Sequence, residues 1–252
     1  MTLSTLVLLI AAIALVLTAV VAVVYRAHKS WLLTFLQNFC GTLFVFSGAV
    51  KAIDPLGTAF KMEQYFAEFE TTFAHSWFSF LAPLFPWLSS HAPTFSTAMI
   101  TLEIVVGVML LIGSRVKLTS WVFLIILVFF TFLTGFTYLT GYVPDRVIIA
   151  QKANEKDRDV LPEDFEVLAT EGWAVKDTVD VHFFNFGYWQ EYQETNMKVT
   201  DCGCFGDFLK LKPKTSFLKD IFLLIPALLF VFRHRRMHRL FSAAGRTAIV
   251  GL

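Results

Sequence analysis

Apolar residues are concentrated in five long runs, which are separated by short polar loops or by longer mixed segments. A helix that crosses a membrane needs about 20 mostly apolar residues. The fifth run is shorter than the others and contains a proline. The pattern predicts five membrane-spanning helices, at Leu3–Tyr25, Trp31–Val50, Thr94–Gly113, Leu118–Tyr142 and Ser216–Phe232.

Two further stretches are apolar on one side only. In "AFKMEQYFAEFE", helical spacing places Tyr65, Phe66 and Phe69 on one face. We expect this helix to lie on the membrane surface. The aromatic run Phe73–Leu88 is interrupted by two prolines, which favours an interfacial or re-entrant element.

Composition agrees with a membrane protein. The 252 residues are 56% hydrophobic and only 16% charged, whereas soluble domains average about 25% charged residues. Three cysteines in this length exclude a disulfide-dense secreted scaffold. The first apolar run lacks a basic leader and a small-residue cleavage site, so we interpret it as a retained helix rather than a signal peptide.

The charges are distributed unevenly between the predicted loops. Basic residues without any acid occupy two short loops and the C-terminal tail: Arg26, Lys29, Arg115, Lys117, Arg233, Arg235, Arg236, Arg239 and Arg246. Because basic loops remain in the cytoplasm, we expect the N-terminus outside and the C-terminus in the cytoplasm, in a bacterial inner membrane. Lysines 210, 212, 214 and 219 make the last helix ambiguous by itself, and the two short loops decide the orientation.

These patterns divide the chain into four segments. Residues 1–30 form the N-terminal span and a cytoplasmic turn, and residues 31–142 carry the next three spans with an outer segment at 51–93. Residues 143–200 form a loop outside the cytoplasm, which would be periplasmic in a bacterium. Residues 201–252 contain a cysteine motif, the last span and the basic tail.

The stretch "VTDCGCFGDF" places Cys202 and Cys204 one residue apart, on the predicted outer side. Disulfides persist there, and a ring closed over Gly203 would be strained, because disulfide geometry prefers Cα atoms about 5.5–6 Å apart. Strained disulfides exchange readily, which favours a redox role. Asp201 and Asp207 oppose thiolate formation.

Two other interpretations of this motif stay open. Gly203 and Gly206 also suit a purely structural tight turn, in which the two thiols are either free or joined as a disulfide. A tetrahedral zinc site would need two more ligands. His182 and the aspartates have the right chemistry, but their spacing fits no standard pattern, so we predict no metal.

Glu103 lies near the centre of the third predicted span, where a carboxylate costs about 2.5–3.5 kcal/mol. It must be paired or protonated, and the second span offers Asn38, Ser47 and Lys51 as neighbours. The alternatives are a proton relay, the polar edge of a quinone pocket, or a clamp between helices. Cys40 is interpreted as a small buried hydrophobe. Close helix approach is expected at glycines 41, 48 and 107.

Three ordered motifs resemble the DoxX/MauE superfamily of bacterial inner-membrane, redox-associated proteins: "GTLFVFSGAVKAIDPLGTAFKMEQYFAEF" (41–69), "LEIVVGVMLLIG" (102–113) and "VTDCGCFGDFLKLKPKTSFLKDIFLL" (199–224). The third motif is similar to a branch that ends in "TDCGCFGD". The resemblance implies a four-helix bundle. This chain would add an N-terminal transmembrane helix (3–25) and an insertion in the outer loop (147–198).

The resemblance also implies redox chemistry, because such proteins are linked to disulfide formation in a partner and to membrane oxidoreductase complexes. We therefore expect a thiol–disulfide oxidoreductase that uses Cys202 and Cys204 on a partner protein outside the cytoplasm. Electrons would pass to a quinone or to a partner, since no haem or flavin motif is visible. The alternative is a non-catalytic accessory or scaffold subunit of a larger membrane complex. A solute carrier is a weaker third option, because no inverted repeat is apparent.

Overall fold

The computed structural model describes residues 2–24, 30–74, 79–139, 142–144, 167–168, 173–174, 189–192, 199, 203, 205–206, 208–209 and 211–240. Five of its helices are long and apolar enough to cross a membrane, as the sequence predicts. The protein is therefore an all-α polytopic membrane protein. These helices are α1 (Leu3–Val23), α2 (Trp31–Ile53), α5 (Ala92–Ile112), α6 (Val116–Leu139) and α8 (Pro213–Arg233).

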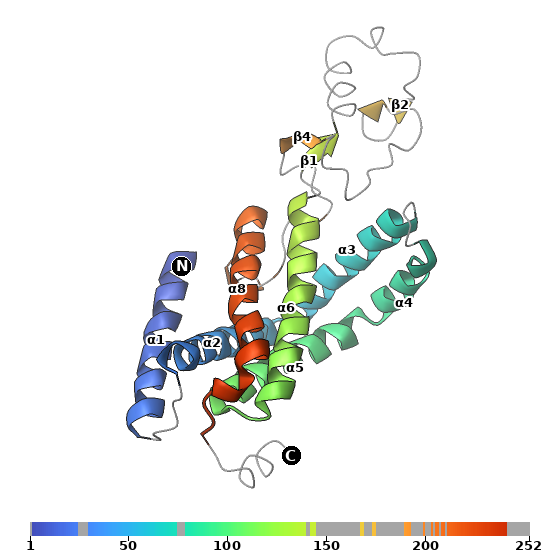
Figure 1. Ribbon diagram of the computed structural model, residues 1–252. Helices are drawn as coiled ribbons and strands as arrows, with labels where there is room; N and C mark the ends of the chain where they lie inside the picture. The colour runs from blue at the N-terminus through green and yellow to red at the C-terminus, as the bar shows by residue number, and fades with distance from the viewer. Residues whose placement is uncertain are drawn as a thin grey trace.

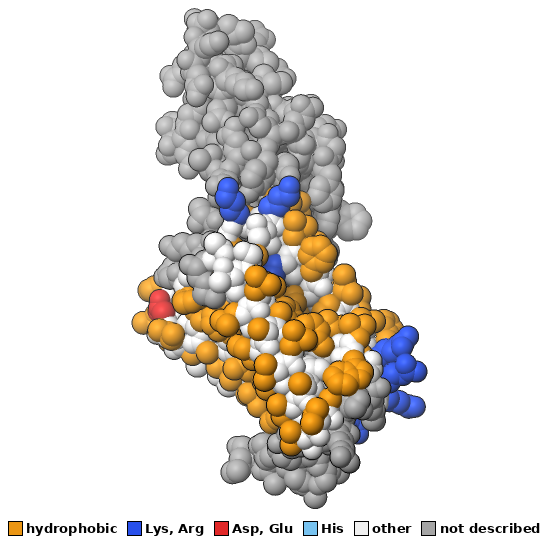
Figure 2. All heavy atoms as spheres, turned by 90° about the vertical axis from the view of Figure 1, so that its left-hand side faces the viewer, with side chains coloured by type: hydrophobic (Ala, Val, Ile, Leu, Met, Phe, Trp, Pro, Cys, Tyr) orange, Lys and Arg blue, Asp and Glu red, His pale blue; other side chains and the backbone are white. Residues whose placement is uncertain are grey.

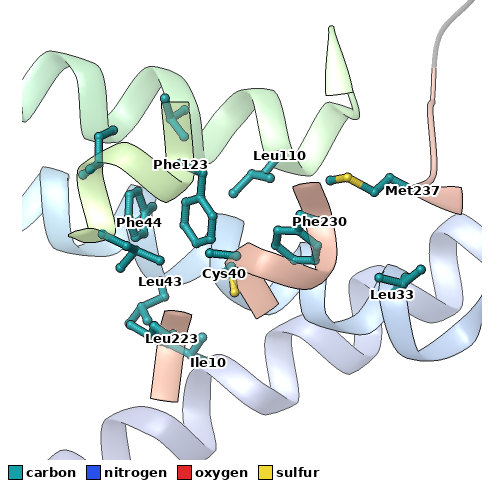
Figure 3. Packing of buried hydrophobic residues seen from close by; sticks show 14 of the residues in the cluster. Ile10, Leu33, Cys40, Leu43, Phe44, Leu110, Phe123, Leu223, Phe230 and Met237 are labelled. Carbon is teal, nitrogen blue, oxygen red and sulfur yellow. The ribbon is translucent and has the colours of Figure 1, made fainter. Parts of the chain in front are cut away.

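The five helices share one apolar core. Helix α2 packs against α1 and α5, and α6 lies beside α8 (Figure 1). Each helix contributes buried side chains that meet around Phe44 and Phe123, whose ring centroids are 4.7 Å apart (Figure 3). Cys40 lies within this core, is fully buried and is a free cysteine, as expected of a small hydrophobe.

Glycines allow α2 and α5 to approach closely. A Cβ atom added to Gly107 would lie 2.8 Å from the backbone nitrogen of Val45 and 2.9 Å from the carbonyl oxygen of Gly41. One added to Gly48 would lie 2.6 Å from the side chain of Ile104. The predicted close approach at these glycines is confirmed, and it brings the polar residues of the two helices into contact.

Helix α3 (Pro55–Ala74) follows α2 after a single residue, Asp54. The side chain of Asp54 accepts a hydrogen bond from the backbone N–H of Gly57 at 2.9 Å. It therefore caps the new helix, with Pro55 at the position where a missing N–H costs nothing. The "DPLG" part of the first motif is thus a helix-to-helix junction.

The aromatic face of α3 is buried against protein. Tyr65, Phe66 and Phe69 are each at most 4% exposed, and the Phe69 and Phe136 rings meet edge to face at 4.8 Å. Tyr65 also shares a 2.6 Å hydrogen bond with Thr137 of α6. The run that follows contains a 3₁₀ turn (Ser79–Leu81) and the short helix α4 (Leu84–Ser90).

Short strands occur in the segment between α6 and α8. β1 (Tyr142–Pro144) pairs antiparallel with β4 (Trp189–Tyr192), and β2 (Val167–Leu168) pairs with β3 (Trp173–Ala174). Tyr142 lies opposite Tyr192, so the first pair closes the base of the predicted outer loop. Most of the remaining predicted insertion lies outside the described residues.

The chain beyond α8 passes through a 3₁₀ turn (His234–Arg236) and docks on the α5–α6 turn. Gln37 of α2 accepts a hydrogen bond from the backbone N–H of His238 at 3.1 Å and donates to the carbonyl of Leu110 at 2.7 Å. The His238 ring contacts the carbonyl oxygen of Leu111 at 2.9 Å through Nε2, so that nitrogen carries the proton. Burial lowers the pKa of His238, and this hydrogen bond offsets the effect in part.

Apolar side chains cover much of the surface of the bundle (Figure 2). Leu8, Val16, Ile125 and Phe222 are each more than 60% exposed on three different spanning helices, which suits contact with lipid. Exposed basic residues gather at the end of the bundle that holds the α5–α6 turn, where the backbone N–H of Leu240 donates to the carbonyl oxygen of Ile112 at 3.0 Å. These residues are Arg115, Lys117, Arg233, Arg235, Arg236 and Arg239. Six of the nine basic residues of the predicted cytoplasmic side thus lie at one end of the bundle, and Arg26, Lys29 and Arg246 lie outside the described residues.

Candidate functional site

A buried ion pair joins α2 to α5. The Lys51 Nζ atom lies 2.7 Å from Oε1 of Glu103, and both side chains are almost fully shielded, at 5% and 2% exposure. Gly48 lies one helical turn before Lys51 and allows α5 to come close enough for this contact. Each charge compensates a partner that would otherwise be costly within the membrane.

A second ion pair lies on α8. The Lys219 Nζ atom is 2.9 Å from Oδ1 of Asp220, and Oδ2 of Asp220 accepts a hydrogen bond from Thr134 of α6 at 3.0 Å. Asp220 is 1% exposed. It is not among the residues predicted from the sequence, because an acid near the start of the last apolar run was grouped with the charges outside the membrane. Its position inside that run was the available signal.

Aromatic rings cover both lysines. The ammonium group of Lys51 lies 4.5 Å from the ring centroid of Phe130, and that of Lys219 lies 5.0 Å from the ring centroid of Phe205. Such contacts are worth about 2 kcal/mol when they are desolvated. Phe205 is the residue that follows the cysteine motif, and it is 2% exposed. It anchors that segment beside the charges.

Two cavities adjoin the ion pairs, each of about 20 Å³, and Lys51 lines both. The first lies between Ser47, Glu103, Phe205 and Asp220. The second is bordered by Lys61, Tyr65 and Gly203. A cavity needs roughly 10–15 Å³ to hold a water molecule, so each admits about one water and neither admits an organic cofactor.

The described part of the cysteine motif is a tight turn. Gly203 and Gly206 have positive φ angles of 59° and 52°, and the N–H of Gly206 donates to the carbonyl of Gly203 at 3.1 Å. The turn places Gly203 against the side chain of Lys61. The predicted redox residues Cys202 and Cys204, and the flanking Asp201 and Asp207, lie outside the described residues.

The predicted neighbours of Glu103 have different positions. Lys51 contacts it and Ser47 lines the same cavity, whereas the side chain of Asn38 donates to Thr18 of α1 at 3.1 Å. Asn38 thus fastens the N-terminal helix to the bundle. Within the described ranges, no three His, Cys, Asp or Glu residues come together as a metal site would require.

Comparison with known proteins gives one family match. Residues 29–145 are similar to the family described as methylamine utilisation protein MauE. The match spans α2 to α6 and ends before the cysteine motif and α8. No curated protein matches the chain, and no solved structure does. The resemblance to the MauE side of the superfamily is therefore supported, while the branch with "TDCGCFGD" stays a prediction.

Proposed function

We propose that the protein is a membrane-embedded thiol–disulfide redox protein that acts on a partner outside the cytoplasm through Cys202 and Cys204. The observation that carries the proposal is the position of the turn. Gly203 and Phe205, which bracket Cys204 in the sequence, border cavities that are lined by one buried lysine, two part-buried lysines and two buried carboxylates. A turn with a purely structural role has no need of buried charges beside it, because burying charges costs free energy.

Lys51 and Lys61 give this setting a chemical use. Both line the cavity that Gly203 borders, and the ammonium group of Lys51 also contacts Glu103 at 2.7 Å. Ammonium groups near a thiol favour the thiolate, which is the attacking species. They would counter the aspartates at 201 and 207, which were the main objection to a reactive pair.

The proposed reaction is a pair of exchanges. A thiol of the partner attacks the Cys202–Cys204 disulfide, which forms a mixed disulfide and releases one cysteine thiolate. A second partner thiol resolves that intermediate, so the partner is oxidised and the pair is reduced. A quinone would then take two electrons and two protons from the pair and become a quinol. Because neither cavity admits a quinone ring, it would approach from the bilayer.

Mixed-disulfide trapping in intact cells tests this function. Cys202→Ser and Cys204→Ser each leave one cysteine of the pair, and one variant should accumulate a covalent complex with a partner, detectable by mass spectrometry. Cys40→Ser is the matched control, because Cys40 is fully buried and cannot reach a partner, so its loss should leave the covalent complex unchanged. Absence of any complex, together with unchanged partner oxidation in the Cys202→Ser/Cys204→Ser variant, would exclude the redox function.

A non-catalytic accessory role is the second proposal. The family match lies outside the cysteine motif, and the two left-handed glycines with the anchored Phe205 also suit a structural turn. In that case native purification yields a stoichiometric membrane complex. The complex would survive Cys→Ser substitution at both positions with full activity.

A further inference from the structure

The two buried carboxylates differ in how their oxygens are used. Both oxygens of Asp220 are bonded, one to Lys219 and one to Thr134. Glu103 uses only Oε1, for Lys51. Its Oε2 is buried and has no hydrogen-bond partner among the described residues. A carboxylate oxygen left unpaired in this way costs about 1–3 kcal/mol or more, so the exception requires an explanation.

The cavity beside Glu103 offers one. At about 20 Å³ it has the size of a single water site. Ser47 and Asp220 also line it, so a water there would find polar neighbours besides Glu103. A water in a buried site usually makes about three hydrogen bonds, and three polar residues of this lining, Ser47, Glu103 and Asp220, are available as partners.

We propose that this cavity binds one water molecule on Oε2 of Glu103, and that Glu103 exchanges a proton with it. In the forward direction the protonated water gives its proton to the carboxylate, which becomes a carboxylic acid and leaves a neutral water behind. Asp220 is less suited to this role, because each of its oxygens already has a polar partner. The site thus provides a proton-accepting group within the membrane.

The charged groups that face Glu103 limit the electrostatic cost of protonating it. Lys51 on α2 contacts it directly, and Lys219 and Asp220 on α8 border the same cavity. With both carboxylates ionised the four groups sum to zero charge. Protonation of Glu103 leaves one excess positive charge, which the rings of Phe130 and Phe205 face. This proposal does not depend on the thiol chemistry.

Infrared spectroscopy of the whole protein in lipid tests the proposal. A carboxylic acid C=O band should appear on acidification, vanish in Glu103→Gln and remain in Asp220→Asn, which is the matched control. On transfer to D₂O the band should shift promptly, because the water delivers deuterium. If Glu103→Gln does not fold, Glu103→Asp retains a carboxyl group and should move the band rather than remove it.

Two results would overturn the proposal. One is the absence of a Glu103-dependent band at every pH at which the protein stays folded. The other is a band that appears but resists deuterium exchange, which would mean a sealed clamp without water. Since these readouts need no partner and no cysteine, failure of the thiol function leaves them unaffected, and the reverse holds as well.

Discussion

Lys51 and Glu103 depend on each other because both are buried between α2 and α5. Removing one partner of a buried ion pair typically costs about 3–5 kcal/mol, since the remaining charge has no compensation. We expect Lys51→Met to lower the unfolding temperature strongly. The double variant Lys51→Met/Glu103→Leu should recover most of that loss, measured by thermal unfolding in lipid nanodiscs.

This comparison separates structure from chemistry at the same residues. A double variant that is stable but no longer supports partner oxidation assigns the pair a functional role. If the losses of stability from Lys51→Met alone and Glu103→Leu alone added up in the double variant, that result would contradict the coupling that the 2.7 Å contact requires.

Gly203 carries the turn of the cysteine motif. Its φ angle of 59° costs other residues about 1–2 kcal/mol, although the nearest atom to an added Cβ, in Lys61, is an unstrained 3.5 Å away. Gly203→Ala should therefore destabilise the protein through backbone conformation alone. Gly203→Asn should be milder, because asparagine tolerates this region. Equal thermal stability of Gly203→Ala and the native protein would exclude a left-handed residue here.

At the scale of elements, α2 and α5 are in contact through glycine. Gly107→Ala places a methyl group against backbone atoms of α2, which cannot move aside. Gly135→Ala is the matched control, because its new methyl group would lie 3.0 Å from the ring of Phe217, a side chain that can shift. We expect a clear loss of thermal stability only for Gly107→Ala, and similar losses for both would contradict the packing.

The sequence predicts these helices well because a span must be apolar along its whole length. It misplaces their ends where polar residues are buried. Helix α2 continues past Val50 to Ile53 because Lys51 is paired inside the protein. Helix α8 starts before Ser216, at Pro213. Asp220 was likewise assigned to the outside of the membrane, whereas it is buried and paired with Thr134 of α6.

The partner of an apolar face is harder to predict than the face itself. Hydrophobic spacing correctly groups Tyr65, Phe66 and Phe69, but lipid and protein satisfy such a face equally well. The structure shows protein, through Phe136 and Thr137 of α6. The cysteine motif shows a second limit, because the lysines that line the cavity beside Gly203 come from α2 and α3, which are distant in sequence.

At the scale of the whole molecule, His238 ties the C-terminal segment to the helical bundle. Burial lowers its pKa in the folded protein, below the ordinary value of about 6.5, so the released segment binds a proton more readily. Docking is therefore fully stable above about pH 6.5 and weakens as pH falls toward the lowered pKa. The rate of hydrogen exchange at the backbone amides of residues 237–240, corrected for the intrinsic rate, should therefore rise as the pH falls through that window.

The control for this prediction is His238→Gln, which cannot titrate. Its exchange at 237–240 should be the same at both ends of the pH range. A native protein whose exchange in this segment is independent of pH after correction for the intrinsic rate would contradict the account.

The sidedness and redox state of the cysteine pair test the central claim most directly. In a Cys40→Ser background, a membrane-impermeant thiol reagent should label Cys202 and Cys204 in right-side-out vesicles only after mild reduction, and mass spectrometry should find them joined before it. Inverted vesicles should stay unlabelled. Labelling only in inverted vesicles, or thiols that remain reduced and inaccessible on both sides, would contradict a disulfide-exchanging pair on the outer face.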